Sequence, residues 1–180
     1  MIEKKLTNKM FVHIPRTGGT SLLRTFRVWY PDLVTAYEKD KQYTGDFIYG
    51  HYYQNGYDSI IFLREPYEQQ LSYYNYTKMF TAMPDVNTYF RTTQSTMIKF
   101  LPPLNSIKFV GIYEDYENEV KRLAEFLGKP FIKPDRINKC NYLHIPDQES
   151  IDIFKENNKF IYQLYQYSIE NDRVKLESKG

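Results

Sequence analysis

A segment near the start of the chain combines an apolar run, a cation, two glycines and two hydroxyl groups. Residues 11–22 read Phe-Val-His-Ile-Pro-Arg-Thr-Gly-Gly-Thr-Ser-Leu, the order of a buried strand, a tight turn and a helix start. Free backbone N–H groups and the helix dipole favour an anion at a helix N-terminus. Glycines let a phosphate approach the backbone closely because they carry no side chain. The segment therefore predicts a binding loop for a phosphate-bearing ligand.

Two other interpretations of this segment are open. The P-loop of nucleoside triphosphate enzymes has two glycines five apart, followed at once by Lys and by Ser or Thr. Here the cation, Arg16, precedes the glycines and no Lys follows them, which disfavours a triphosphate with magnesium. A turn that only caps a helix would show the same glycines and hydroxyl groups, since these residues punctuate many turns.

A second segment places another cation at the end of an apolar run. Residues 58–66 read Asp-Ser-Ile-Ile-Phe-Leu-Arg-Glu-Pro, and the predicted helix after them contains Ser72. Arg64 would lie at the carboxyl end of a strand, where open α/β sheets bind ligands. Its planar guanidinium can hold a phosphate through two parallel hydrogen bonds, and the Ser72 hydroxyl could share that anion. The alternative is a surface pair of Arg64 with Glu65 and a solvent-facing Ser72.

Together the two segments resemble the PAPS-dependent sulfotransferase superfamily, whose members use 3′-phosphoadenosine-5′-phosphosulfate (PAPS). The closest likeness is to the carbohydrate branch that includes heparan sulfate 2-O-sulfotransferase. Members of that branch carry Ile-Pro-Lys/Arg-Thr-Gly-Gly-Thr-Ser, which residues 14–21 match. They also carry Leu-Arg-Asp-Pro followed by Ser-x-Tyr, which residues 63–66 and 72–74 resemble. Arg16 stands where Lys is common and Glu65 where Asp is usual, and both replacements keep the charge.

The resemblance extends to residues 109–114 and 157–165, which look like the family's late strand and C-terminal helix. It implies that the N-terminal turn is a P-loop-like loop around the 5′-phosphosulfate of PAPS. The residues of that loop are Arg16, Thr17, Gly18, Gly19, Thr20 and Ser21. It also implies that Arg64 and Ser72 hold the 3′-phosphate. Arg16 is expected in addition to stabilise charge on the departing oxygen, and no metal ion is expected to take part.

His51 is the candidate for a catalytic base among the three histidines of the chain. Histidine titrates near neutral pH, so it can accept a hydroxyl proton and release it again. His51 follows a strand-like run and a glycine, which fits either a base at a strand end or a plain turn histidine. The resemblance implies that it is the base, because the family carries its catalytic histidine in a Gly-His segment. His13 lies within an apolar run, which favours a core or second-layer position.

The predicted function is transfer of the sulfuryl group of PAPS to an acceptor hydroxyl, with adenosine 3′,5′-bisphosphate as the second product. The branch resemblance implies that the acceptor is a saccharide. Two alternatives stay open: a kinase-like nucleotide-binding enzyme, and a nucleotide-binding module with a degenerate site. Four tyrosines lie close in sequence to the predicted site and are candidates for acceptor contacts: Tyr52, Tyr53, Tyr73 and Tyr74.

Composition bounds the remaining classes. The chain has 180 residues, enough for one domain with a sizeable core, and a net charge of +2, too small to indicate a nucleic-acid partner. No run of about twenty apolar residues is present, so no membrane span is expected. The first residues lack the apolar core of a signal peptide, and the single cysteine, Cys140, excludes a disulfide within the chain. These features predict a cytoplasmic protein.

The order of elements predicts an α/β protein, a single domain over residues 1–180 with a three-layer fold and a central, mainly parallel sheet. Strands are expected at residues 9–14, 46–49, 59–63 and 107–113. Helices are expected at residues 21–29, 67–80, 86–101, 116–127, 148–156 and 159–170. Residues 32–46 and 130–145 are expected to form loops.

Overall fold

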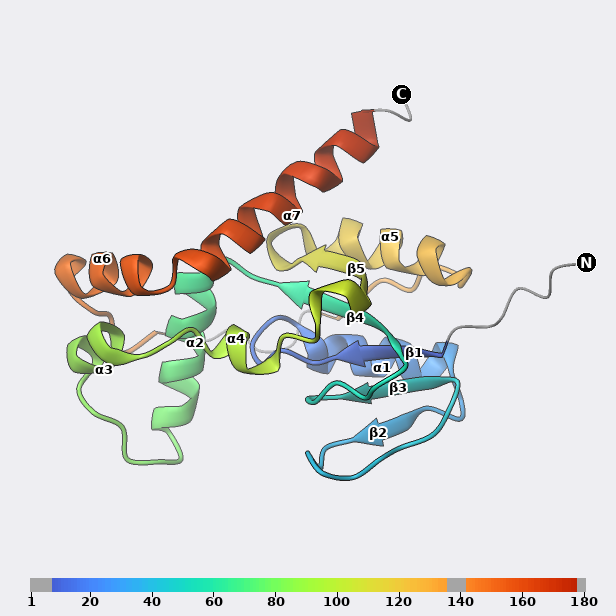
Figure 1. The fold of residues 1–180 in the computed structure, drawn as a ribbon, viewed down its shortest axis with the longest axis horizontal. Helices are drawn as coiled ribbons and strands as arrows, with labels where there is room; N and C mark the ends of the chain where they lie inside the picture. The colour runs from blue at the N-terminus through green and yellow to red at the C-terminus, as the bar shows by residue number, and fades with distance from the viewer. Residues whose placement is uncertain (1–7, 136–141, 178–180) are drawn as a thin grey trace, which may run out of the picture.

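The computed structural model describes residues 8–135 and 142–177, and Cys140 lies outside these ranges. Its centre is a parallel sheet of five strands in the order β2–β3–β1–β4–β5 (Figure 1). The strands are β1 (Lys9–Val12), β2 (Val34–Ala36), β3 (Phe47–Gly50), β4 (Asp58–Leu63) and β5 (Ile107–Ile112). Seven α-helices accompany them in the described ranges, which confirms the predicted α/β class and the parallel sheet.

The apolar runs of the sequence explain which strands lie at the centre of the sheet. A strand that is covered on both faces must carry apolar side chains at successive positions, without polar alternation. Every residue of β4 after Asp58 is buried, and so is every residue of β1 after Lys9. These two strands are neighbours in the middle of the sheet, with β3 on the other side of β1.

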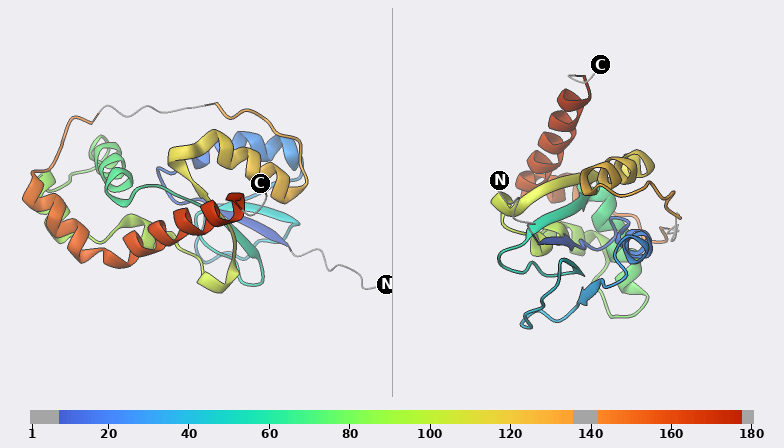
Figure 2. Two further views of the ribbon diagram at one scale, coloured as in Figure 1. Left: turned by 90° about the horizontal axis from the view of Figure 1, so that it is seen from above. Right: turned by 90° about the vertical axis from the view of Figure 1, so that its right-hand side faces the viewer.

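Helices cover both faces of this sheet (Figure 2). α1 (Gly19–Trp29) and α5 (Tyr116–Leu127) pack on one face, and α4 (Thr96–Phe100) and α7 (Lys159–Glu177) pack on the other. Successive side chains of a strand point to opposite faces, so each strand contributes to both layers of core. The arrangement is consistent with the predicted three layers.

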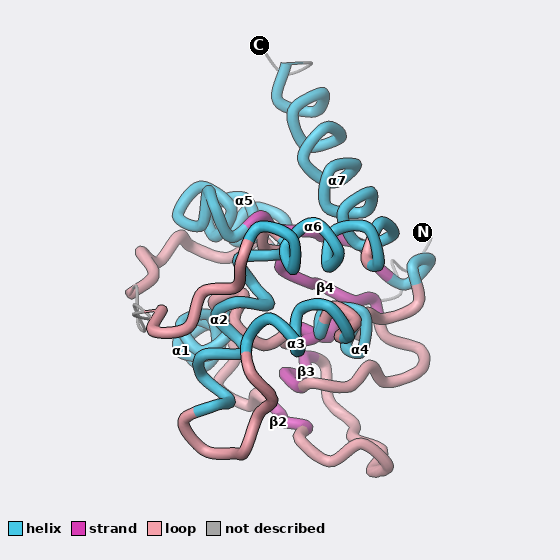
Figure 3. Tube along the Cα trace, turned by 90° about the vertical axis from the view of Figure 1, so that its left-hand side faces the viewer, coloured by secondary structure: helices cyan, strands magenta, loops and turns pink. Residues whose placement is uncertain are grey.

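Three further helices gather at the carboxyl edge of the sheet (Figure 3). They are α2 (Pro66–Lys78), α3 (Val86–Thr92) and α6 (Gln148–Asn157). Their shared core includes Phe90 and Phe154, both fully buried. Two 3-10 helices flank β5, at Leu104–Ser106 and Tyr113–Asp115. The parallel strands run toward α2, which places this helix beside the loops that leave β1 and β4 (Figure 1).

Two sequence-based expectations are wrong. Residues 32–46, expected to form a loop, contain the edge strand β2, which pairs with β3. Residues 86–101, expected to form one helix, form α3 and α4 with a break between them. Thr93 is extended and the Ser95 N–H donates to Oδ1 of Asn158 at 2.6 Å. Thr93 and Ser95 carry hydroxyl groups, which favour helix caps over helix interiors. The tertiary contact of Ser95 with Asn158 then decides where the helix ends.

The remaining elements lie close to their expected positions, although α7 continues beyond residue 170 to Glu177. The described parts of residues 130–145 contain no helix or strand. Within the described ranges, no helix has both the length and the hydrophobicity that a bilayer span requires.

Gly50 tests the pairing of β2 with β3. A Cβ at Gly50 would lie 2.2 Å from the carbonyl oxygen of Ala36, its partner on β2. We therefore expect Gly50→Ala to lower the free energy of unfolding by about 1–3 kcal/mol, measured by urea denaturation. Gly128→Asn is the control, because no atom lies within 4 Å of a Cβ there and asparagine is the side chain that best tolerates a left-handed φ of +63° at a helix C-cap. Equal stabilities of the two variants would contradict this strand pairing.

Candidate functional site

The strand order brings three predicted site segments to one edge of the sheet. His51 follows β3, the glycine turn follows β1, and Arg64 follows β4. These three strands are neighbours and parallel, so all of them end at the same edge. After β1 the chain forms β2 and β3 on one side of this strand, and later β4 and β5 on its other side. Open α/β sheets bind ligands where the strand order reverses in this way.

The turn between β1 and α1 has an unusual backbone. Gly18 caps α1 with a left-handed φ of 87°. Arg16 has a φ of 68°, and in the described part of the chain no other non-glycine residue has a positive φ. This conformation costs a non-glycine residue roughly 1–2 kcal/mol. Gln69 of α2 holds the turn from outside, since its Nε2 donates to the carbonyl of Pro15 at 2.8 Å.

Both glycines of the turn are required by packing. A Cβ at Gly18 would lie 2.5 Å from the ring of Tyr116, and one at Gly19 would lie 2.0 Å from the ring of His13. The same aromatic layer binds the glycine carbonyls. The hydroxyl of Tyr116 donates to the Gly18 oxygen at 2.6 Å, and that of Tyr49 donates to the Gly19 oxygen at 3.0 Å. The first turn of α1 is therefore tied to α5 and to β3.

A small cavity lies in front of this turn. Its volume is about 40 Å³, enough for one compact anion when a water needs about 10–15 Å³. The lining residues are Arg16, Gly18, Gly19, Thr20, Ser21, Arg64 and Tyr113. Two of them are cations, and no carboxylate is among those described. The N–H groups of Gly19 and Thr20 have no acceptor in the described ranges, as expected for the start of a helix.

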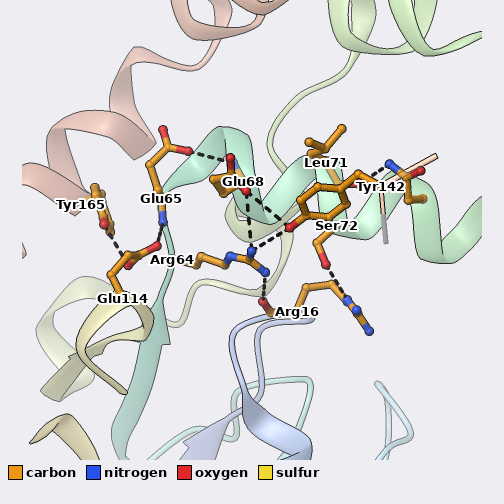
Figure 4. Close-up of polar contacts among 10 residues, drawn as sticks. Arg16, Arg64, Glu65, Glu68, Leu71, Ser72, Glu114, Tyr142 and Tyr165 are labelled. Atoms are coloured by element: carbon orange, nitrogen blue, oxygen red, sulfur yellow. Dashed lines mark hydrogen bonds and ion pairs between the residues drawn. The ribbon is translucent and has the colours of Figure 1, made fainter. Parts of the chain in front are cut away.

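Arg16 and Ser72 are brought together by α2. The Arg16 Nε donates to Oγ of Ser72 at 3.0 Å (Figure 4). The Arg16 guanidinium also lies over the ring of Tyr76 at 4.8 Å. Ser72 is 1% exposed, so the alternative of a solvent-facing Ser72 is wrong. Its hydroxyl accepts from Arg16 directly, and the predicted sharing of an anion between Ser72 and Arg64 stays a prediction.

Arg64 is held by four groups beside the cavity. Its Nη2 donates to the Tyr142 hydroxyl at 2.8 Å and lies 3.7 Å from Oε2 of Glu68. Its Nη1 donates to the carbonyl of Arg16 at 3.4 Å, and its guanidinium lies over the ring of Tyr113 at 4.7 Å. The Arg64 side chain is 15% exposed, and Glu68 partly neutralises its charge (Figure 4).

Glu65 starts α2 and does not form the surface pair with Arg64 that was one interpretation of the sequence. Its carboxylate accepts the Glu68 N–H at 2.8 Å, which is the bond of an N-cap, and Pro66 follows at the first helical position. Its own N–H donates to Oε1 of Glu114 at 2.8 Å. Burial raises the pKa of Glu65; the hydrogen bond from the Glu68 N–H opposes this rise, and the charges of Glu68 and Glu114 add to it. Residues 63–66 therefore end β4, cap α2 and leave Arg64 at the carboxyl edge of the sheet.

His51 lies beside the turn, on the far side of His13. The two imidazole rings stack with centroids 4.6 Å apart, and the His51 Nδ1 lies 2.9 Å from the carbonyl oxygen of His13. A carbonyl can only accept, so His51 Nδ1 carries the proton in this bond and Nε2 keeps the lone pair. Tyr37 and Phe100 each place a ring 5.8 Å from the imidazole. This tautomer presents Nε2 as a proton acceptor.

Two of the three hydroxyl groups of the predicted loop, those of Thr17 and Ser21, have protein partners. Thr17 is buried, its hydroxyl donates to the Ile14 carbonyl at 2.8 Å, and it does not line the cavity. The Ser21 hydroxyl donates to the Asp135 carbonyl at 2.6 Å. Thr20 is exposed and lines the cavity. An anion in the cavity would therefore meet Thr20 directly and would have to compete with Asp135 for the Ser21 hydroxyl.

The tyrosine candidates are divided by the fold. Tyr74 is fully buried among α2, α3 and α6, so it cannot contact an acceptor. The Tyr53 hydroxyl donates to the Tyr57 carbonyl at 3.0 Å. Tyr52 lies 5.8 Å from Phe100, in the aromatic group around His51. Sequence reasoning missed the tyrosines that support the turn and Arg64, which are Tyr49, Tyr113, Tyr116 and Tyr142; only their positions after strands or near the motifs gave any signal.

Comparison with known proteins adds no family: no family model matches the chain, and no curated protein matches it. In the described ranges, no group of three or more His, Cys, Asp or Glu side chains is placed to hold a metal ion. A functional assignment therefore rests on the residues and geometry of this edge.

His13 makes the stability of the fold depend on pH. Burial, with His51 and Arg16 nearby, lowers the pKa of His13 from 6.5 to about 3. The unfolded chain thus binds a proton that the folded protein does not, so this contribution is complete above pH 6.5 and falls toward pH 3. We expect a slope of about 1.4 kcal/mol per pH unit from this group, which His13→Gln removes. Urea unfolding of both proteins across this range measures the difference, and equal slopes would contradict a ring that stays neutral in the folded protein.

Proposed function

We propose that this protein is a PAPS-dependent sulfotransferase that transfers the sulfuryl group to an acceptor hydroxyl with His51 as the base. The observation that carries the proposal is the convergence at one sheet edge of a histidine with a free Nε2, a helix N-terminus and two arginines. The likeness of residues 14–21 and 63–66 to the sulfotransferase motifs supports the choice of nucleotide. The geometry supports the pairing of these motifs across β1 and β4.

The nucleotide would lie across the two motifs. Its 5′-phosphosulfate would lie at the P-loop-like turn with one of its two anionic groups in the cavity, where Arg16 and the N–H groups of Gly19 and Thr20 offer donors. Its 3′-phosphate would be held by Arg64 and by Ser72, whose hydroxyl accepts from Arg16 Nε. The cavity accepts one compact anion only, so the adenosine would extend outside it.

The transfer step requires a base and a stabilised leaving group. The acceptor oxygen would form a bond to sulfur while the bond from sulfur to the phosphate oxygen breaks, releasing adenosine 3′,5′-bisphosphate. His51 Nε2 would take the hydroxyl proton, and its Nδ1–H bond to the His13 carbonyl would stabilise the resulting imidazolium. Arg16 would offset the charge on the departing oxygen, so the scheme uses fixed cations and amides without a metal ion.

The proposed acceptor is a saccharide hydroxyl. Three aromatic side chains lie at or near His51. Tyr37 and Phe100 contact its ring, and Tyr52 contacts Phe100. Tyr37 is 51% exposed, so part of this aromatic surface is open to a ligand. Flat apolar faces of this kind can stack on the C–H face of a sugar ring. The class of acceptor otherwise rests on the branch resemblance.

His51→Ala tests the base. We expect turnover to fall by about 10²–10⁴-fold, because a positioned proton acceptor contributes that much, while the affinity for adenosine 3′,5′-bisphosphate changes little. Sulfate transfer from a radiolabelled donor to a panel of sugars measures the first quantity, and calorimetry measures the second. His144→Ala is the control, since His144 packs against Tyr74 in another part of the molecule. Normal turnover in His51→Ala would rule out this base.

Variants of Arg64 and Glu68 test the 3′-phosphate site, because the two changes should alter nucleotide affinity in opposite directions. Removing charge-assisted hydrogen bonds costs about 1.5–3 kcal/mol, so Arg64→Ala should weaken binding of adenosine 3′,5′-bisphosphate by roughly 10–150-fold. Glu68→Gln removes the carboxylate 3.7 Å from Arg64 and should strengthen binding by up to about fivefold. Titration calorimetry compares both variants with the natural protein, and the opposite signs separate a charge effect from unfolding.

Ligand-induced thermal stabilisation separates the alternatives. Adenosine 3′,5′-bisphosphate should raise the melting temperature more than ATP with magnesium, because a ligand stabilises the state that it binds. Stabilisation by ATP alone would favour the kinase-like enzyme. Tight binding of the bisphosphate with no transfer to any acceptor would identify a nucleotide-binding module with a degenerate site.

A further inference from the structure

His13 connects the predicted base to the glycine turn. Its Nδ1 lies 2.8 Å from the Tyr49 hydroxyl, and that hydroxyl lies 3.0 Å from the carbonyl oxygen of Gly19. Tyr49 has one hydroxyl hydrogen, and the Gly19 oxygen can only accept it. With that hydrogen directed at the Gly19 oxygen, His13 Nδ1 is the donor to the Tyr49 oxygen. The hydrogen-bond chain runs from His13 through the Tyr49 hydroxyl to the carbonyl oxygen of Gly19.

The backbone of His13 sets the proton of the second ring. Its carbonyl accepts from His51 Nδ1 at 2.9 Å, while its own N–H donates to the carbonyl of Gly50 at 2.6 Å. Both histidines thus carry their proton on Nδ1, and the two rings stack at an interplanar angle of 27°. A shift of His13 would move both the base and the hydrogen bond that fixes its tautomer.

The ring of His13 also touches the turn directly. A Cβ on Gly19 would lie 2.4 Å from the His13 Nε2, so the imidazole fills the place of that side chain. Tyr49 is 2% exposed, and burial raises the pKa of its hydroxyl, which keeps it a hydrogen-bond donor. The Gly19 peptide is therefore held by ring contact and by a hydroxyl that both belong to this layer.

We propose that His13 and Tyr49 are positioning residues that hold the base and the sulfate-binding turn in one fixed relation. Neither side chain need contact the acceptor; His13 acts through His51 and Tyr49 acts through His13 and Gly19. The expected effect on catalysis rests on the proposed function, whereas the hydrogen bonds among these residues do not depend on it. A buried polar chain in which each donor has an acceptor rigidifies the groups that it joins.

The proton positions can be read without any nucleotide. Long-range proton–nitrogen correlation NMR distinguishes the protonated nitrogen of each histidine ring from the bare one. In the natural protein at neutral pH, His13 and His51 should both be protonated at Nδ1. Tyr49→Phe removes the acceptor of the His13 proton, and the share of His13 protonated at Nε2 should rise. A His13 ring protonated at Nε2 in the natural protein, or unaltered by Tyr49→Phe, would overturn the inference.

The catalytic consequence needs a matched control. Tyr57 is also a buried tyrosine whose hydroxyl donates to a glycine carbonyl, that of Gly45, at 3.1 Å, and it lies outside the proposed site. We expect Tyr49→Phe to lower kcat by about ten- to a hundredfold with a smaller change in KM for PAPS, because misplaced groups lose rate. Tyr57→Phe should keep kcat within about threefold at a similar loss of stability.

The outcomes distinguish the two proposals. If the natural protein transfers sulfate and Tyr49→Phe behaves like Tyr57→Phe, the positioning role is wrong and the proposed function stands. If the natural protein transfers no sulfate to any acceptor, the proposed function fails, and the ring-proton measurement alone decides whether His13 and Tyr49 hold His51 and Gly19 as described.

Discussion

The parallel pairing of β1 with β3 on one side and β4 on the other is the interaction on which the candidate site depends. The β1–β3 register ends at Val12 opposite Gly50, and the next N–H, of His13, continues the pairing. His51 is thereby placed against the turn that leaves β1. Side chains alternate between faces, so a slip by one residue would exchange the two cores, and burial on both faces protects the register.

The positive charge of the edge comes from two cations held close together. Arg64 donates to the carbonyl of Arg16, and each guanidinium lies over a tyrosine ring. Such contacts offset part of the repulsion between like charges, and Glu68 offsets more. An anion between the arginines would offset the remaining repulsion between them, so the arrangement favours an anionic ligand over a neutral one.

The glycines of the turn pack closely against aromatic rings. Gly18 and Gly19 lie against the rings of Tyr116 and His13, so a larger side chain at either position would disturb the core before it reached a ligand. Glycines in a motif of this kind are therefore not by themselves a sign of phosphate. Arg16, in contrast, has a left-handed backbone that costs a non-glycine residue free energy, and strain of this kind is common at functional sites.

The amino-acid sequence by itself determined the α/β class, the parallel sheet, the turn before α1 and the start of α2, because these follow from local periodicity and capping. It placed Arg16, Arg64 and His51 after strands, but not in contact. Tertiary structure decided that β2 is a strand, that the helix breaks at Thr93, and that Ser72 contacts Arg16. It also decided which tyrosines stand behind the turn. Those contacts join residues dozens of positions apart, and their free energy depends on strand order and burial, which local patterns do not encode.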